Sequence, residues 1–423
     1  MKEDFLHYVW RFQKFNTHNL VLINGAALSI IKTGEPNINS GPDFFNSKVL
    51  IANQLWVGTV EIHLKSSDWY AHHHEQDPNY DAVILHVVWD HDTDVFRKDN
   101  SSIPTLVLRS KVDAITLTNY QNLFSKKLKW INCENEISKI NPLIIDNWLD
   151  RLYLERLQEK SVFIQEELNA SNNHWERLLF KLLCKNFGLN VNGASFYSIS
   201  KSVDYKVIQK CFKNHFELEA LLFGQAGFFE EVHEDSYFIF LKEKYGYLKS
   251  KFKLENKEII RPKYFRLRPI NFPSIRLSQL AVLFSEKPSL FSEIIIAKTQ
   301  EDFYSIFNGT ASEYWDTHYN FGIPSSKRKK RMTKKFIDLL LINTVIPLIF
   351  SYSMFQGKDK SEEIIALTSA ISSEENSIIK KFNLLYPFSK NALQSQALLQ
   401  LKKKYCDNKK CLECSIGNSI LKG

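Results

Sequence analysis

The sequence has little of what marks disulfide-rich, disordered or membrane proteins. Six cysteines in 423 residues are too few for a disulfide framework, and 14 glycines with 12 prolines argue against extended disorder. The longest apolar run, residues 336–350, is interrupted by Asp338, Asn343 and Pro347, so it predicts a buried helix rather than a membrane span. Because no charged-then-apolar leader precedes the first helix, we expect a cytoplasmic protein with reduced thiols.

The composition allows a large core and a polyanionic partner. Hydrophobic residues make up 44% of the chain, and the formal net charge is +8. A positive surface attracts nucleic acid, which is the partner we expect, while no membrane partner is predicted. A basic run at residues 326–335 precedes an apolar helix and fits either a solvated loop or a nucleic-acid contact.

The pattern of apolar residues divides the chain near residue 115. Residues 3–15 have helical periodicity, and strands follow in hairpins that turn at Asn24-Gly25 and near residues 52–54. Residues 81–89 are apolar and β-branched, as in a central strand. We therefore predict an α+β domain over residues 1–115 and a mainly α-helical domain over residues 116–423.

Acidic and histidine side chains are concentrated on the strands of the first domain. Because side chains alternate along a strand, Glu61, His63 and Lys65 should share one face. Asp43 stands at the start of the preceding strand, which a hairpin would place beside Glu61. Two carboxylates on neighbouring strands suit Mg²⁺ or Mn²⁺, and a nearby base could orient or deprotonate an attacking water.

This arrangement resembles the PD-(D/E)xK nucleases. Gly41-Pro42-Asp43 matches the position of their Asp motif, and Glu61-Ile62-His63 that of their acid-x-Lys motif. His63 replaces the usual lysine, and Lys65 follows two residues later, so either could serve. The resemblance implies a restriction-endonuclease-like fold, Asp43 and Glu61 as metal ligands, and His63 or Lys65 as a catalytic group.

Two further features extend that resemblance. Gln76 and Tyr80 form a Q-x-x-x-Y pattern, which in RecB-type nucleases follows the acid-x-Lys strand and contacts DNA. An acid from the first helix completes the metal site in several of these enzymes, and Glu3 is the candidate here.

The histidine-rich connector offers an alternative metal site. His72 and His74, with Asp77 nearby, could bind zinc, which would favour a zinc-dependent small-molecule hydrolase. A polar loop without metal is also consistent with these residues. His86, in the middle of an apolar strand, is expected to be a core histidine unless it faces Glu61.

Three of the six cysteines gather near the C-terminus. The spacing Cys406-x4-Cys411-x2-Cys414 suits zinc or an iron–sulphur cluster such as 4Fe-4S, and Cys133 is the expected fourth ligand. Such a structural metal would join residue 133 to the chain terminus. It resembles the iron–sulphur staple of some helicase-associated nucleases, although there the distant cysteine precedes the nuclease core. Three unligated thiols are the alternative.

The whole chain resembles an uncharacterised bacterial family, chiefly from Bacteroidetes, catalogued as domain-of-unknown-function family 2851. The resemblance rests on the blocks NSGPDFFNSKVLI, WVGTVEIHLKSSDW, HHEQDPNYDAVILHVVW, KWINC, FRLRPINFPSIRLSQLA and CLECSIGN. It implies no established activity. In the fifth block, Arg268 and Arg276 could contact phosphate or brace a loop.

The residues together favour a metal-dependent nuclease that hydrolyses phosphodiester bonds of DNA or RNA. A non-catalytic nucleic-acid-binding protein with the same fold is the first alternative, and the zinc-dependent hydrolase is the second.

Overall fold

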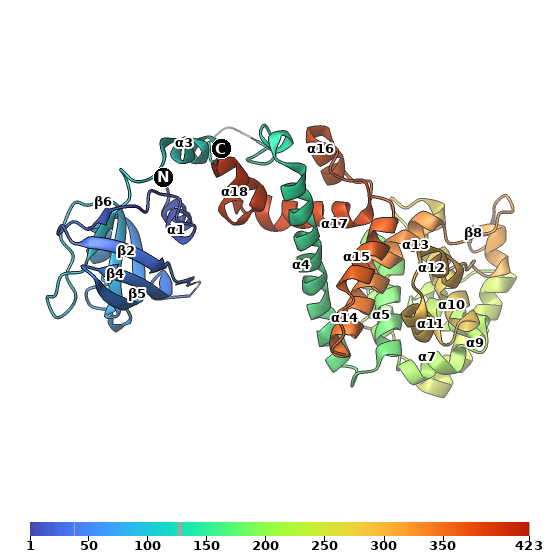
Figure 1. Ribbon diagram of the computed structural model, residues 1–423. Coiled ribbons are helices and arrows are strands. Elements are labelled where there is room, and N and C mark those ends of the chain that lie inside the picture. Colours follow the sequence, from blue (N-terminus) through green and yellow to red (C-terminus); the bar gives the residue numbers. More distant parts are fainter. Residues whose placement is uncertain (38, 126–128, 423) are drawn as a thin grey trace. The chain divides into compact units, whose positions relative to one another are not determined.

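The protein is described by a computed structural model that covers residues 1–37, 39–125 and 129–422. The chain forms two compact units (Figure 1). Unit 1 contains Met1–Trp148, Leu384–Tyr386 and the C-terminal stretch that begins at Leu401, and unit 2 contains Leu149–Asn383 and Pro387–Gln400. An N-terminal α/β region with a mixed sheet is thus followed by a mostly helical region, as the sequence predicted.

Unit 1 is built around one sheet, and short helices surround it. Its elements are α1 (Glu3–Arg11), β1 (Leu20–Val21), β2 (Ala27–Lys32), β3 (Glu35–Pro36), β4 (Phe44–Ile51), β5 (Gln54–Lys65), α2 (Asp68–Ala71), η1 (Pro78–Tyr80), β6 (Val83–Asp90), β7 (Thr105–Val107), α3 (Ala114–Leu123), η2 (Ile137–Lys139), the start of α4 (Pro142–Asn169), η7 (Leu401–Cys406), η8 (Cys411–Glu413) and α18 (Ser415–Lys422).

The sheet is mixed, with the strand order β1-β2-β4-β5-β6-β7 and with β3 paired to β4. The pairs from β1 to β5 are antiparallel, whereas β5–β6 and β6–β7 are parallel. The hairpin turn between β4 and β5 consists of Ala52 and Asn53, both with positive φ (48° and 65°), the conformation of a two-residue type I′ turn. This turn fixes the register that brings the start of β4 opposite Val60 of β5.

The longest strand, β5, is buried on both faces near its end. Val60 and Ile62 join a core with Phe5 of α1 and Leu421 of α18. Glu61 and His63 alternate with them and are also buried, at 5% and 1% exposure. A second apolar cluster forms around Trp69, Tyr80 and Val83. Alternation along β5 therefore separates an apolar face from a face that carries polar groups at low exposure.

Unit 2 is almost entirely helical. It contains most of α4, and then α5 (Trp175–Phe187), α6 (Leu189–Lys201), α7 (Tyr205–Cys211), α8 (His215–Gln225), η3 (Phe228–Glu230), α9 (Ser236–Phe252), η4 (Pro269–Asn271), α10 (Pro273–Glu286), α11 (Leu290–Ile296), α12 (Gln300–Ile306), η5 (Glu313–Asp316), β8 (His318–Asn320), β9 (Ile323–Pro324), α13 (Lys334–Leu340), η6 (Leu341–Val345), α14 (Ile346–Phe355), α15 (Ser361–Ala370), most of α16 (Ser377–Leu385) and α17 (Ala392–Gln400).

One helical segment, Lys334–Phe355, is long and apolar enough to cross a membrane, with a mean hydropathy of 1.7. However, 72% of its apolar window is buried inside the protein, as in the core helix of a soluble domain. The segment includes the π-helical turn η6. The prediction of a buried helix over residues 336–350 is confirmed.

Candidate metal centre

The structure brings the carboxylates of Asp43 and Glu61 together between β4 and β5. The backbone N–H of Asp43 donates to Oε2 of Glu61 at 3.1 Å, and the backbone N–H of Ile62 donates to Oδ2 of Asp43 at 2.9 Å. Each carboxylate thus accepts a hydrogen bond from the backbone of the opposite segment. The Glu61 carboxylate is held beside the backbone of Asp43, and the Asp43 carboxylate beside that of Ile62. This places two carboxylates close enough to act on a common ligand.

Helix α1 adds an acid and an imidazole to this end of the sheet. Nε2 of His7 lies 3.3 Å from Oδ2 of Asp43. Burial raises the pKa of Glu3, and the neighbouring Asp43 carboxylate raises it further. Burial alone would lower the pKa of His7, but its contact with Asp43 and the charge of that carboxylate raise it overall. Glu3 and His7 are one helical turn apart, so both side chains reach the same place.

Three imidazoles converge on the other side of Glu61. One ring nitrogen from each of His63, His72 and His74 lies within 4.8 Å of the others. Oε1 of Glu61 is 3.3 Å from Nε2 of His74 and 3.5 Å from Nε2 of His63. Metal bonds of about 2.1 Å place tetrahedral donors about 3.4 Å apart, so these separations fit a single bound ion.

A second layer of side chains orients the imidazoles. Nδ1 of His63 lies 2.8 Å from Nε2 of His86, so a proton on Nδ1 would leave Nε2 of His63 free to bind a metal. Tyr80 stacks on His74 with ring centroids 3.7 Å apart, and Trp69 packs edge-on against both His74 and Tyr80. His86 therefore orients His63, and the rings of Tyr80 and Trp69 fix the position of His74.

Burial sets the charges of this centre. Burial and the adjacent Asp43 carboxylate raise the pKa of Glu61 well above its usual range. Burial, followed by the neighbouring imidazoles, lowers the pKa of His63 to about 2 and that of His86 to about 3. His63 and His86 are therefore neutral at physiological pH, the state in which imidazole binds a metal. A bound cation would favour the ionised form of Glu61.

Other residues predicted for this region lie apart from the carboxylates. Lys65, at the end of β5, is exposed, and its charge acts on Asp92. Gln76 is exposed and donates to Glu75. Asp77 accepts from the backbone N–H of Asn79 and so caps η1. His63, rather than Asp77, accompanies His72 and His74 in the three-imidazole set.

The two arginines predicted to bind substrate have different surroundings in unit 2. Arg276 is only 4% exposed, donates to Gln279 and Asn271, and covers the ring of Phe336 at 3.5 Å. This placement favours the bracing role of Arg276 over a phosphate contact. Arg268, just before η4, is exposed and accessible to a ligand.

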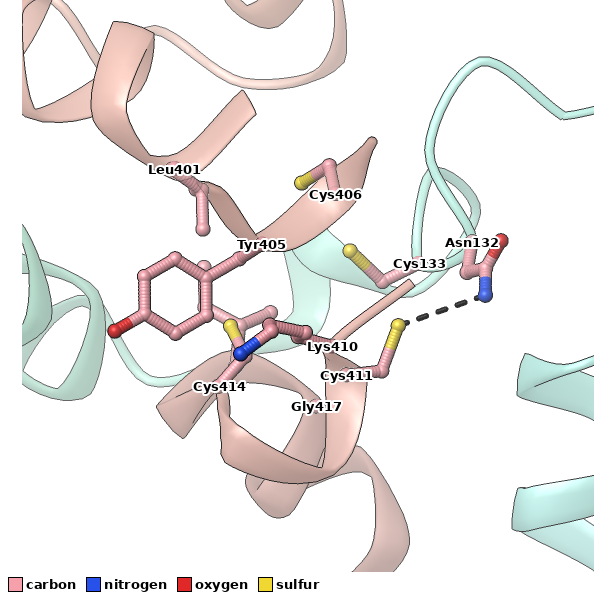
Figure 2. A pocket seen from close by; sticks show the side chains of 10 residues that line it. Asn132, Cys133, Leu401, Tyr405, Cys406, Lys410, Cys411, Cys414 and Gly417 are labelled. Atoms are coloured by element: carbon pink, nitrogen blue, oxygen red, sulfur yellow. Dashed lines mark hydrogen bonds between the residues drawn. The ribbon is translucent and has the colours of Figure 1, made fainter. Parts of the chain in front are cut away.

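The four predicted cysteine ligands meet within unit 1. Cys133, Cys406, Cys411 and Cys414 line one cavity, together with Tyr405 (Figure 2). All four are free thiols. Burial raises the pKa of each of them, to about 11 for Cys411. Cys133 thus lines the same cavity as the three C-terminal thiols, and its role as a metal ligand stays a prediction.

Two residues of the centre did not emerge from the sequence. His7 could have been found because it follows Glu3 by four residues on an amphipathic helix. Trp69 is 1% exposed and lies against the histidine cluster. No local sequence pattern predicts that Trp69 packs against the histidines, because its position depends on how the connection between β5 and β6 folds onto the sheet.

Comparison with known proteins identifies the family. Neither curated proteins nor solved structures gave a match. The family described as "Protein of unknown function (DUF2851)" matches residues 3–377, which include the whole carboxylate and histidine centre and Cys133. The three C-terminal cysteines lie outside the matched range. Because the match covers most of the sequence, the chain belongs to the DUF2851 family.

Proposed function

We propose that the protein is a metal-dependent nuclease that hydrolyses phosphodiester bonds in DNA or RNA. The observation that supports this most directly is the convergence of Asp43 and Glu61, each hydrogen-bonded to the other's strand. It is the arrangement on which the resemblance to PD-(D/E)xK nucleases depends. His63 takes the position of the usual lysine and contacts Glu61 instead of solvent.

The donor set favours a particular kind of ion. Carboxylates suit Mg²⁺ and Mn²⁺, whereas imidazoles suit transition metals. Because Glu61 lies between the acids Glu3 and Asp43 and the imidazoles of His63 and His74, Mn²⁺ is a better fit than Mg²⁺. When bound, a divalent ion would polarise the phosphate and lower the pKa of a coordinated water.

The residues around that ion would have separate roles. Asp43 and Glu61 would bind it, and Glu3 would add negative charge from α1. His86 would hold His63 in one tautomer. His7, which lies 3.3 Å from Asp43 and whose pKa that carboxylate raises, would donate a proton to the leaving oxygen.

Exposed cations support a nucleic-acid substrate. In unit 2, the loop before α13 and the start of that helix expose Lys327, Arg328, Lys329, Arg331, Lys334 and Lys335. Lys330 of the same run is buried, with its ammonium donating to the Asp316 carbonyl. Its basic side chains are therefore solvated except at Lys330, a form in which phosphates can be bound.

The test measures cleavage of end-labelled single- and double-stranded DNA and RNA with Mn²⁺ or Mg²⁺. Wild-type protein should cleave at least one of them, and Glu61→Gln and Asp43→Asn should each reduce the rate by at least a hundredfold. The matched control is Glu258→Gln, which removes an exposed carboxylate in unit 2 and should leave the rate unchanged. Metal-loaded protein that binds nucleic acid without cutting it would instead indicate a non-catalytic binding protein.

The three-imidazole set favours a second candidate, a zinc-dependent hydrolase of small molecules. This function predicts one tightly held zinc per chain and hydrolysis of a small ester or phosphodiester without cleavage of nucleic acid. His72→Ala would distinguish the two candidates, because it should abolish zinc binding and activity in the second and weaken metal affinity only partly in the first.

A further inference from the structure

We propose that Cys133, Cys406, Cys411 and Cys414 bind a [4Fe–4S] cluster rather than a single zinc ion. The inference is independent of the nuclease proposal, because it concerns a different set of ligands in unit 1. It rests on the number of thiols, on their spacing and on what surrounds them.

Four thiols from separate segments surround a single cavity (Figure 2). Cys133 lies between α3 and η2, Cys406 ends η7, Cys411 begins η8, and Cys414 follows it. Four cysteines around one space match the full ligand set of a four-iron cluster or of a structural zinc.

The spacing of the sulfurs separates these two possibilities. Zn–S bonds of about 2.3 Å place four tetrahedral sulfurs about 3.8 Å apart. Within the described residues, the group of three candidate ligands with atoms within 4.8 Å of one another is formed by His63, His72 and His74, and no group of cysteines meets this limit. No three of the four sulfurs are therefore that close. A cubane cluster, which places its own iron and sulfide between the ligands, needs this wider spacing.

Hydrogen-bond donors lie next to two of the four cysteine sulfurs. The side-chain amide of Asn132 donates to Sγ of Cys411 at 3.5 Å, and backbone N–H groups of Ile416 and Gly417 donate to Cys414. A Cβ at Gly417 would lie 2.1 Å from the Cys411 carbonyl oxygen, so this close approach requires glycine. Hydrogen bonds to the sulfurs stabilise a bound cluster.

Loading the site needs no electron transfer if the cluster arrives preformed. A [4Fe–4S]²⁺ unit would exchange its donor's ligands for the four cysteine sulfurs. The four thiols would release four protons, and the bound cluster would carry a net charge of −2 with its thiolates. The iron–sulphur bonds to the donor break as those to the cysteines form.

The cluster would also support the structure around α1. Cys133, Cys411 and Leu412 pack against the core that contains Phe5 and Leu6 of α1. Helix α1 carries Glu3 and His7. A cluster that joins residue 133 to the C-terminal segment would thus stabilise the packing behind the metal centre without contributing a ligand to it.

The test is elemental analysis of protein expressed with added iron and purified without oxygen. We expect about four iron and four acid-labile sulfide atoms per chain and an absorption band at about 400 nm. Cys406→Ser should lose most of the iron and the band. Cys211→Ser, which alters a buried free thiol in unit 2, is the matched control and should keep both.

Several results would overturn the proposal. One zinc and no sulfide per chain in the wild-type protein would do so, as would protein without metal, or Cys406→Ser protein with full iron. If Cys406→Ser is insoluble, the iron-to-sulfide ratio of the wild-type protein still decides. Nuclease assays do not enter this test, so failure of one proposal leaves the other intact.

Discussion

Replacing Glu61 with glutamine should stabilise the metal-free protein while removing its response to metal. Glu61 is 5% exposed and lies beside a second carboxylate, Asp43, so its ionised form is costly without a bound cation. Glutamine has nearly the same shape and can still accept the backbone N–H of Asp43. The variant therefore removes the charge and keeps the packing.

The size of the effect follows from proton linkage. The pKa of Glu61 is raised in the folded protein above its ordinary value of 4.5, so the folded chain keeps a proton that the unfolded chain releases. Its contribution to stability is full below pH 4.5 and is lost as the pH rises toward the folded pKa. The loss is about 1.4 kcal/mol per pH unit, so at pH 7 Glu61→Gln should be more stable by up to about 3 kcal/mol. This corresponds to a rise of roughly 6 °C in Tm.

Thermal unfolding of chelator-treated wild-type and Glu61→Gln protein at pH 5, 6, 7 and 8 measures this difference. It should grow with pH, and Glu258→Gln should track the wild type. Addition of Mn²⁺ at about 100 times its Kd should stabilise the wild type by about 2.7 kcal/mol and the variant hardly at all. A stability difference that stays constant between pH 5 and pH 8 would refute the idea that burial raises the pKa of the Glu61 carboxyl.

Three further substitutions test separate parts of the structure. Tyr80→Leu removes the ring stacked on His74 and should weaken Mn²⁺ or Zn²⁺ binding about tenfold by calorimetry, while Tyr80→Phe should not. Ala52→Asn places a residue that tolerates positive φ in the β4–β5 turn and should raise the unfolding free energy by about 0.5–1 kcal/mol in urea titrations. Burial lowers the pKa of Lys160 to about 7, so between pH 7 and 10 the unfolded chain holds a proton that the folded chain has released. The unfolding free energy of the wild type should therefore rise with pH over this range relative to that of Lys160→Met. Parallel pH profiles of the two proteins would contradict this.

Local sequence signals were enough to predict the strands that carry the centre. Asn24-Gly25 and the turn at Ala52-Asn53 specify two hairpins, and these determine which strands are neighbours. Alternation along β5 then places Glu61 and His63 on one face. The proximity of Asp43 to Glu61 follows from hairpin geometry, in which residues on paired strands are a fixed distance apart.

The imidazole half of the centre could not be derived in this way. The stretch from Ser66 to Asp81 contains one four-residue helix and a single 3-10 turn, and neither has a periodicity that predicts where its side chains point. Its path is set by the burial of Trp69 and Tyr80 against the sheet. Tertiary packing, and not local pattern, therefore brings His74 to Glu61.

The position of the candidate metal centre depends on the framework that holds it. A cluster of buried acids and neutral imidazoles destabilises a protein unless a cation is bound, so it persists only on a framework that holds it in place. In unit 1 that framework is the mixed sheet, on which α1 packs with Phe5 and α18 with Leu421 in one apolar core. The acids project from the same elements whose other faces form this core. Along β5, residues of the core therefore alternate with residues of the candidate metal centre, and the Glu61 carboxyl is buried between Val60 and Ile62.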